Sequence, residues 1–265
     1  MKLSLSTPIL AVVCMPGLAL SETPAPATDP RAIEIAQSAA DFLVSQERFS
    51  FNWFVSVDEV IDGREKVTEF RSGRNLVDRA LGFVSETENR EGFRDYYFDG
   101  ETFTIASPAD NTFASAEFIG EIDALAAAAQ AYTGSTVPLW SLMSPSLGER
   151  MTEGVLSGAY LGETVIAGRP VHHLAFSEYD SDWQLWVDTD PDRPLIVMLI
   201  GTDPYTQGWP QYRAYLSNWD FAPETGPEVF TFAPDENDTP IAMPDLVPPA
   251  AAEEASAGDT PAASE

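Results

Sequence analysis

The segment 169–219, RPVHHLAFSEYDSDWQLWVDTDPDRPLIVMLIGTDPYTQGWPQYRAYLSNW, decides the fold of this 265-residue chain. It holds four largely apolar runs, at 171–177, 182–187, 195–201 and 211–219, separated by short connections rich in Asp, Pro and Gly. Such connections are typical of neighbouring antiparallel strands. The stretch 195–200, LIVMLI, is apolar at every position. Because successive strand side chains point to opposite faces, this strand must be covered on both sides, so the sheet is sandwiched or curved around something apolar.

More strands are predicted upstream and downstream of this segment. Residues 49–58 alternate between apolar and polar side chains, with Phe54 as the exception, and Asp62 and Gly63 then form a hairpin turn. The turn signals that follow indicate an antiparallel meander. Its further strands are expected at 66–72, 76–85, 93–98, 101–107 and 112–117, with a later strand at 154–165 and the last at 229–232.

Helices are expected at three places. Asp29 followed by Pro30 is typical of a helix start, and the apolar stripe that follows predicts a helix to about Gln46. Residues 121–132 form a second predicted helix, for which Gly134 is a natural stop, and 138–143 can form one or two helical turns. This helical insertion, placed between two β-meanders, is expected to cover one face of the sheet.

The ends of the chain look different from its middle. Residues 1–21 have the basic start, the apolar run and the small residues of a secretory signal peptide. Residues 22–29 read as a linker, 30–234 as one domain, and the Pro-, Ala- and acid-rich stretch 235–265 as a disordered tail. No later stretch reaches the roughly 18 apolar residues of a membrane span. These features predict export to a bacterial periplasm.

Charge and cysteine content exclude several classes of function. The formal net charge is −28, from 14 Lys and Arg against 42 Asp and Glu, which argues against nucleic acids and anionic membranes as partners. The single cysteine, Cys14, lies inside the predicted signal peptide. The mature chain is therefore expected to lack disulfides, thiol catalysis and metal sites that use cysteine.

The candidate catalytic and metal-binding residues do not have the sequence spacing that such sites require. His172 and His173 are adjacent strand residues, so they should point to opposite faces and cannot share a metal. The loop 188–192, DTDPD, begins like a calcium loop, but Arg193 and Leu199 stand where that loop needs glycine and glutamate. Glycine-rich nucleotide motifs are also missing. The sequence therefore predicts a non-enzymatic protein without cofactor or metal.

With catalytic, metal and nucleotide sites set aside, the aromatic side chains are the remaining candidates for a functional site. Trp183 and Trp186 fall on opposite faces of one predicted strand, so both faces meet something large. Either one face is core and the other lines a groove for an acyl chain or an apolar partner, or both faces are core.

Short motifs in a fixed order carry a family resemblance. They are YFDG at 97–100, YLG at 160–162, HLAF at 173–176, DWQLWV at 182–187, PQYRAYLSNW at 210–219 and FTF at 230–232. With them the chain resembles the predicted periplasmic proteins of a domain of unknown function in the LolA and LolB-like superfamily. The resemblance implies an α+β fold, a strongly curved antiparallel half-barrel whose concave face is covered by helices. It also implies binding of lipoprotein acyl chains or related amphiphiles, or sensing of them in the envelope.

Two functions follow as hypotheses. The first is a periplasmic carrier or sensor that holds a lipid or lipoprotein acyl chain under the helical cover. The second is a protein-interaction module with a filled core and no ligand, which docks a periplasmic partner through its acidic surface or tail. For the first hypothesis, alternation and position predict seven cavity-lining residues: Trp53, Phe103, Leu139, Trp140, Met143, Leu174 and Trp186.

Overall fold

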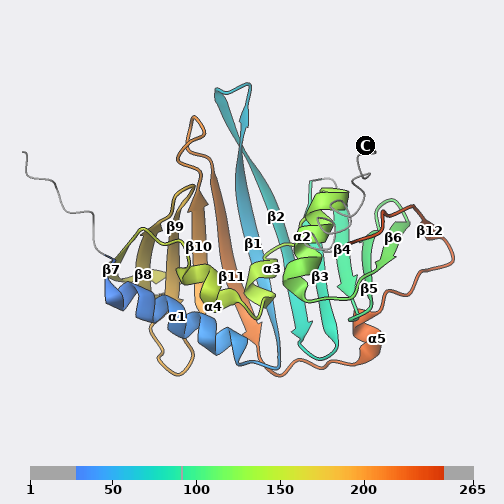
Figure 1. Ribbon diagram of the computed structural model, residues 1–265, viewed down its shortest axis with the longest axis horizontal. Helices are drawn as coiled ribbons and strands as arrows, with labels where there is room; N and C mark the ends of the chain where they lie inside the picture. Colours follow the sequence, from blue (N-terminus) through green and yellow to red (C-terminus); the bar gives the residue numbers. More distant parts are fainter. Residues whose placement is uncertain (1–27, 91, 248–265) are drawn as a thin grey trace, which may run out of the picture.

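A computed structural model describes residues 28–90 and 92–247 of the chain (Figure 1). Its centre is a 12-stranded open sheet in the order β12-β6-β5-β4-β3-β2-β1-β11-β10-β9-β8-β7. Neighbouring strands are antiparallel except for the parallel pair β12 and β6. The strands are β1 Arg48–Ile61, β2 Glu65–Asp78, β3 Gly82–Asn89, β4 Gly92–Phe98, β5 Thr102–Ser107, β6 Thr112–Glu117, β7 Ser157–Ile166, β8 Arg169–Ser177, β9 Asp182–Asp188, β10 Ile196–Thr202, β11 Gln211–Asp220 and β12 Thr239–Pro240.

The strand order joins two meanders side by side. Strands β1 to β6 form one half and β7 to β11 the other, and they meet where β1 pairs with β11, with Val55 opposite Ala214. The segment 169–219 forms β8 to β11, as its four apolar runs predict. The expected fold class, a curved sheet with helices on its concave face, is confirmed, apart from the one parallel pair.

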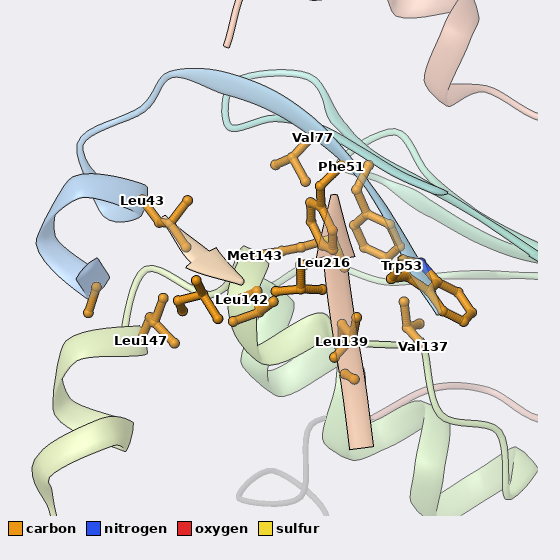
Figure 2. Packing of buried hydrophobic residues seen from close by; sticks show 14 of the residues in the cluster. Leu43, Phe51, Trp53, Val77, Val137, Leu139, Leu142, Met143, Leu147 and Leu216 are labelled. Carbon is orange, nitrogen blue, oxygen red and sulfur yellow. The ribbon is translucent and has the colours of Figure 1, made fainter. Parts of the chain in front are cut away.

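Four helices lie on one face of the sheet, which is the concave face (Figure 1). They are α1 Pro30–Val44, α2 Ile122–Thr133, α3 Trp140–Met143 and α4 Leu147–Thr152. A single hydrophobic core joins them to the strands, and Figure 2 shows Leu142 and Met143 of α3 converging on Phe51 and Leu216 of the sheet. A shorter helix, α5 Pro227–Phe230, packs on the opposite, convex face, where Phe230 meets Leu76 and Val84.

Helix α1 begins where its sequence predicts. Asp29 is the N-cap, and its carboxylate accepts a hydrogen bond of 2.9 Å from the backbone N–H of Arg31. Most of the buried face of the helix is made of small side chains, because Ala32, Ala36, Ala39 and Ala40 are fully buried and only Leu43, at the end of the helix, adds a large one. Small side chains allow a helix to lie close to the layer below it, so α1 closes one end of the concave face tightly.

Two predicted strands are wrong. The expected strand at 76–85 is the end of β2 and the start of β3, separated by a turn in which the Asp78 carboxylate accepts from the Ala80 N–H at 3.0 Å. The turn carries Asp78 and Arg79, and Gly82 follows it, but its Leu81 packs on the convex face as a strand residue would. The expected last strand at 229–232 is instead the end of α5. There a single turn of helix is enough to bury Phe230.

The domain extends beyond its predicted end at residue 234. Strand β12 pairs with β6, and Leu246 is 6% exposed within the main core, so residues 235–247 belong to the fold. A polar, proline-rich stretch can still add backbone pairing to an open sheet edge, which composition does not reveal. The predicted signal peptide with Cys14, linker residues 22–27, and 248–265 of the predicted tail lie outside the described residues. Within the described residues, no helix combines the length and hydrophobicity needed to span a membrane.

Candidate functional site

A groove lies between helices α3 and α4 and strands β9 to β11 on the concave face. Its volume is about 410 Å³, within the range of about 300–1,000 Å³ that is usual for small-molecule sites. The helices contribute Leu142, Leu147 and Met151 together with Ser141 and Arg150, and the floor is mostly apolar, with Gln184 as its polar member. The floor residues are Trp183, Leu185, Ile196, Leu199 and Tyr212. The arrangement is a slot with apolar walls that can hold an extended apolar chain.

Strand alternation brings the floor residues to one face. Trp183 and Leu185 are two positions apart on β9 and both contact the main core. On β10 a register shift between Ile196 and Met198 interrupts the alternation, so Ile196 and Leu199 both join the concave face although they are three positions apart. Such a bulge re-aims side chains next to a site. The continuous apolar run LIVMLI therefore covers both faces of β10, as predicted.

The wall formed by α3 and α4 is held by hydrogen bonds rather than by long helices. Ser144, between the two helices, is fully buried, and its hydroxyl donates to the Asp123 carboxylate of α2 at 2.9 Å. The same hydroxyl oxygen accepts from the Ser146 N–H at 2.9 Å. Helices of this length are not stable alone. Their position depends on these bonds and on the burial of Leu142, Met143 and Leu147 (Figure 2).

Polar groups are concentrated at the rim of the groove. The indole N–H of Trp183 donates to Glu178 at 2.7 Å. The guanidinium of Arg150 lies over the Trp140 ring, 4.5 Å from its centroid, and forms no ion pair with the described part of the chain. On the floor, Tyr212 adds a phenol that can donate a hydrogen bond, and burial raises its pKa to about 12. The groove can thus meet a polar end as well as an apolar chain.

Six of the seven predicted lining residues lie on the concave face, but most of them are packed core. Phe103 and Leu174 are fully buried, Met143 is 1% exposed and Trp53 is 3% exposed. Leu139 is buried beside them, and the half-buried Trp140 packs against the same core. None of the six lines the groove under α3 and α4. Trp140 comes nearest to it, through its contact with Arg150.

The placement of Trp186 with the other six is wrong. Its ring stacks on His173, with 4.3 Å between the ring centroids. It belongs to a separate cluster with Val171 and Val197 on the convex face. Trp183 is the tryptophan of β9 that faces the helices. The alternation of side chains along β9 places Trp183 and Trp186 on opposite faces of the sheet, but it does not determine which of these faces the helices cover.

Two polar side chains to which the sequence analysis gave no role, one fully buried and one half-buried, hold the helical cover on the sheet. Asn75 of β2 is fully buried; its side-chain oxygen accepts from the Trp53 indole N–H and from the Ser85 hydroxyl, both at 2.9 Å. Its amide donates to the Pro138 carbonyl at 2.9 Å, just before α3. An isolated Asn in a strand carries no sequence signal for this role.

Arg79 is the second such side chain. Its guanidinium donates to three backbone carbonyls: Gln46 at 2.9 Å, Met143 at 3.0 Å and Leu43 at 3.1 Å. It therefore ties the end of α1, the start of β1 and the end of α3 to the β2–β3 turn. Three carbonyl acceptors suit the fixed donor geometry of a guanidinium.

The histidines do not form a site together. His173 stacks on Trp186, and its Nε2 lies 2.9 Å from the Gln184 amide oxygen, which is an acceptor. His172 instead contacts the Tyr160 hydroxyl at 3.2 Å. Their opposite orientation agrees with the sequence analysis. Among residues 28–90 and 92–247, no group of His, Cys, Asp and Glu side chains could hold a metal ion.

Comparison with solved structures finds similar folds at low sequence identity. The lipoprotein LppX of Mycobacterium tuberculosis is 14% identical with a TM-score of 0.45, over 72% of this chain and 96% of that one. LprF of Mycobacterium bovis is 13% identical with a TM-score of 0.45, over 76% and 99% of the two chains. A LolA superfamily protein of Nitrosomonas europaea is 12% identical with a TM-score of 0.36, over 76% and 97%.

Comparison of the sequence with protein-family models identifies the family of this chain. No curated protein matches the chain. A family model described as "Predicted periplasmic protein (DUF2092)" matches residues 32–243, from the first turn of α1 to beyond β12. The chain therefore belongs to the DUF2092 family of predicted periplasmic proteins.

Proposed function

We propose that this periplasmic protein is a carrier or sensor that binds the apolar chain of one amphiphile in the groove under α3 and α4. The observation that carries the proposal is the groove itself, with its apolar floor on β9 to β11 and its apolar helical wall. Each methylene group that moves from water into such a slot contributes about 0.8 kcal/mol. A fatty acid or the acyl chain of a lipoprotein fits this chemistry.

The rim supports an amphiphile over a plain hydrocarbon. Arg150 lies at the groove with no ion pair to the described residues, and Tyr212 offers a protonated phenol. A carboxylate or phosphate at the end of the chain would give the guanidinium a charged partner. Because α3 and α4 are much shorter than α1, they can move apart to admit the chain more easily than α1 can.

A fluorescent fatty acid tests this function, with the two neighbouring residues Leu199 and Met198 as a matched pair. Leu199 lines the groove, whereas Met198 packs on the convex face. Leu199→Trp fills the groove and should weaken binding by at least about tenfold, equivalent to about 1.4 kcal/mol. Met198→Trp adds the same ring on the other face and should leave binding within about twofold. Equal effects of the two variants, or no binding by the wild type, would contradict the proposal.

The second candidate function is an interaction module without a ligand. The complete burial of Phe103 and Leu174, which were predicted to line a cavity, favours it, because that part of the concave face is filled. Native mass spectrometry of the mature protein, purified gently from a bacterial periplasm, separates the two. A bound amphiphile of one copy per chain would support the carrier or sensor, and a clean mass with no uptake on titration would support the module.

A further inference from the structure

Three hairpin loops meet at one end of the sheet and form a connected rim. The loop 178–181 joins β8 to β9, and the loop 203–210 joins β10 to β11. The Tyr205 hydroxyl connects these loops by donating to the Tyr179 carbonyl at 2.8 Å. The ammonium of Lys66, at the base of the β1–β2 hairpin, donates to the Gly208 carbonyl at 3.4 Å. In Figure 1 the β10–β11 and β1–β2 hairpins extend beyond the neighbouring strands.

Large aromatic side chains on this rim are exposed. Tyr179 is 82% exposed, Tyr205 73% and Trp209 67%. We call these three residues the aromatic rim. Trp209 also has a φ of 48°, in the left-handed region that bulky residues rarely adopt. The backbone N–H of Trp209 donates to the Thr206 carbonyl at 3.0 Å, so the backbone of the loop is fixed at this residue.

The charges of the three loops suit a surface that carries both signs. Glu178, Asp180 and Asp203 lie on the loops of the aromatic rim, and the β1–β2 hairpin adds Asp62, Arg64 and Glu65. Lys66, beside them, is paired with the buried Asp58 at 3.3 Å. Asp203 accepts hydrogen bonds from the Thr206 hydroxyl and from the N–H groups of Tyr205 and Thr206, which lower its pKa and fix its carboxylate within the loop. The carboxylates can meet the ammonium groups of zwitterionic phospholipids, and the Arg64 guanidinium can meet a phosphate. An anionic surface would be repelled, given the net charge of −28.

Tryptophan and tyrosine suit the headgroup layer of a bilayer, because each has an apolar ring and a polar tip. The loops that carry the aromatic rim also border the groove. Glu178 and Ser181, which flank Tyr179 in its loop, line the groove, and so does Gly201 near the end of β10. A lipid chain leaving a bilayer at the rim would thus have an apolar route under α3 and α4.

We propose that the aromatic rim docks on the surface of a zwitterionic phospholipid bilayer, from which the amphiphile enters the groove. The entry of the amphiphile into the groove rests on the function proposed above. The docking itself is supported by the exposed rings, their connected loops and the charges beside them.

Flotation with vesicles of phosphatidylcholine and phosphatidylethanolamine tests the docking. The wild type should float with the vesicles, and the double variant Tyr179→Ser with Trp209→Asn should bind them at least about tenfold more weakly, because both exposed rings are lost. Asn suits the positive φ at 209, and Tyr205 keeps its bond to the backbone of residue 179. The matched control is Ile119→Ser, which removes an 88% exposed apolar side chain just after β6, at the opposite end of the strands. It should float like the wild type.

A soluble fluorescent fatty acid, measured without vesicles, separates this proposal from the groove. A double variant that loses vesicles but keeps fatty acid binding supports docking through the rim. A wild type that binds the fatty acid but does not float overturns the docking alone and leaves a protein as the rim's partner. A wild type that floats but takes up no fatty acid supports the docking and contradicts the groove. Equal flotation of the double variant and the wild type overturns the role of the rim.

Discussion

Asp58 illustrates how a single side chain can join three strands. Its carboxylate, whose side chain is 1% exposed, accepts from both terminal nitrogens of Arg213 at 3.2 and 3.1 Å and from the Thr68 hydroxyl at 2.8 Å. The Gln211 N–H adds a bond of 3.2 Å, and Lys66 lies 3.3 Å away. The Arg213 guanidinium, with these other donors, holds the pKa of Asp58 far below its ordinary value despite the opposing effect of burial. The residue therefore fixes β1 against β2 and β11.

Asp58→Asn should lower the free energy of unfolding by about 1–3 kcal/mol at neutral pH, since a charged acceptor is lost while its donors stay in place. The lowered pKa means that the unfolded state binds more protons than the folded state as the pH falls. The stabilisation by Asp58 is therefore complete above about pH 4 and is lost in more acidic solution. Urea unfolding at neutral and acidic pH should show the difference between variant and wild type shrinking in acid.

Glu59→Gln is the control for that experiment, because Glu59 is the next residue on β1 and is exposed. It should change the free energy of unfolding by less than about 0.5 kcal/mol. A loss for Asp58→Asn that stays constant with pH would mean that the carboxylate acts by shape and not by charge.

Among the secondary-structure elements, β2 shows how a strand makes room for the core. Gly73 lies opposite Trp53 on β1, and a Cβ atom at position 73 would collide with the Trp53 ring and with the Glu86 carbonyl oxygen of β3. The missing side chain lets the indole lie flat against the strand. From there its N–H reaches Asn75, which in turn holds the chain at Pro138. A glycine in one strand therefore supports the position of α3.

Gly73→Ala should destabilise the protein by about 1–3 kcal/mol, the usual effect of overpacking a filled core. Gly201 is the matched control, because it also lies inside a strand but has nothing within 4 Å of the position of a Cβ atom. Gly201→Ala should be neutral or stabilising by up to about 1 kcal/mol, since it restricts the unfolded chain. Thermal unfolding measures both variants. Similar midpoints for the two would contradict the close approach of Trp53.

The molecule as a whole carries an excess of negative charge. With a net charge of −28, its carboxylates repel one another more strongly when the chain is compact than when it is unfolded. Raising the salt concentration from about 20 mM to about 500 mM shortens the screening length several-fold and should weaken this repulsion. The midpoint of thermal unfolding should therefore rise with sodium chloride.

The control for the salt experiment is an equal ionic strength of a second neutral salt, such as potassium chloride. Both salts should raise the midpoint alike if screening is the cause. A midpoint that falls with salt would show that attractive ion pairs, such as Lys66 with Asp58, outweigh the repulsion.

Most of the fold could be predicted from local patterns. The alternation at 49–58, the four apolar runs of 169–219, and Asp29 with Pro30 each place an element whose bounds in the structure differ by only a few residues. Such patterns are reliable because a strand or helix face depends on the spacing of nearby side chains. The break at 79–81 and the single turn of α5 were missed, since Leu81 and Phe230 pack on the convex face as strand residues would.

The candidate groove could not be predicted in the same way. Ile196 and Leu199 reach one face only through the register shift on β10, and Trp183 rather than Trp186 faces the helices. Asn75 and Arg79 act through carbonyls that lie 63 and 64 residues away along the chain. Each amino acid carries the signal for its own element, but which faces meet depends on the free energy of packing distant elements together. Local pattern therefore determines the strands and their alternation, whereas the pairing of β1 with β11 and the docking of α3 and α4 determine where a ligand can bind.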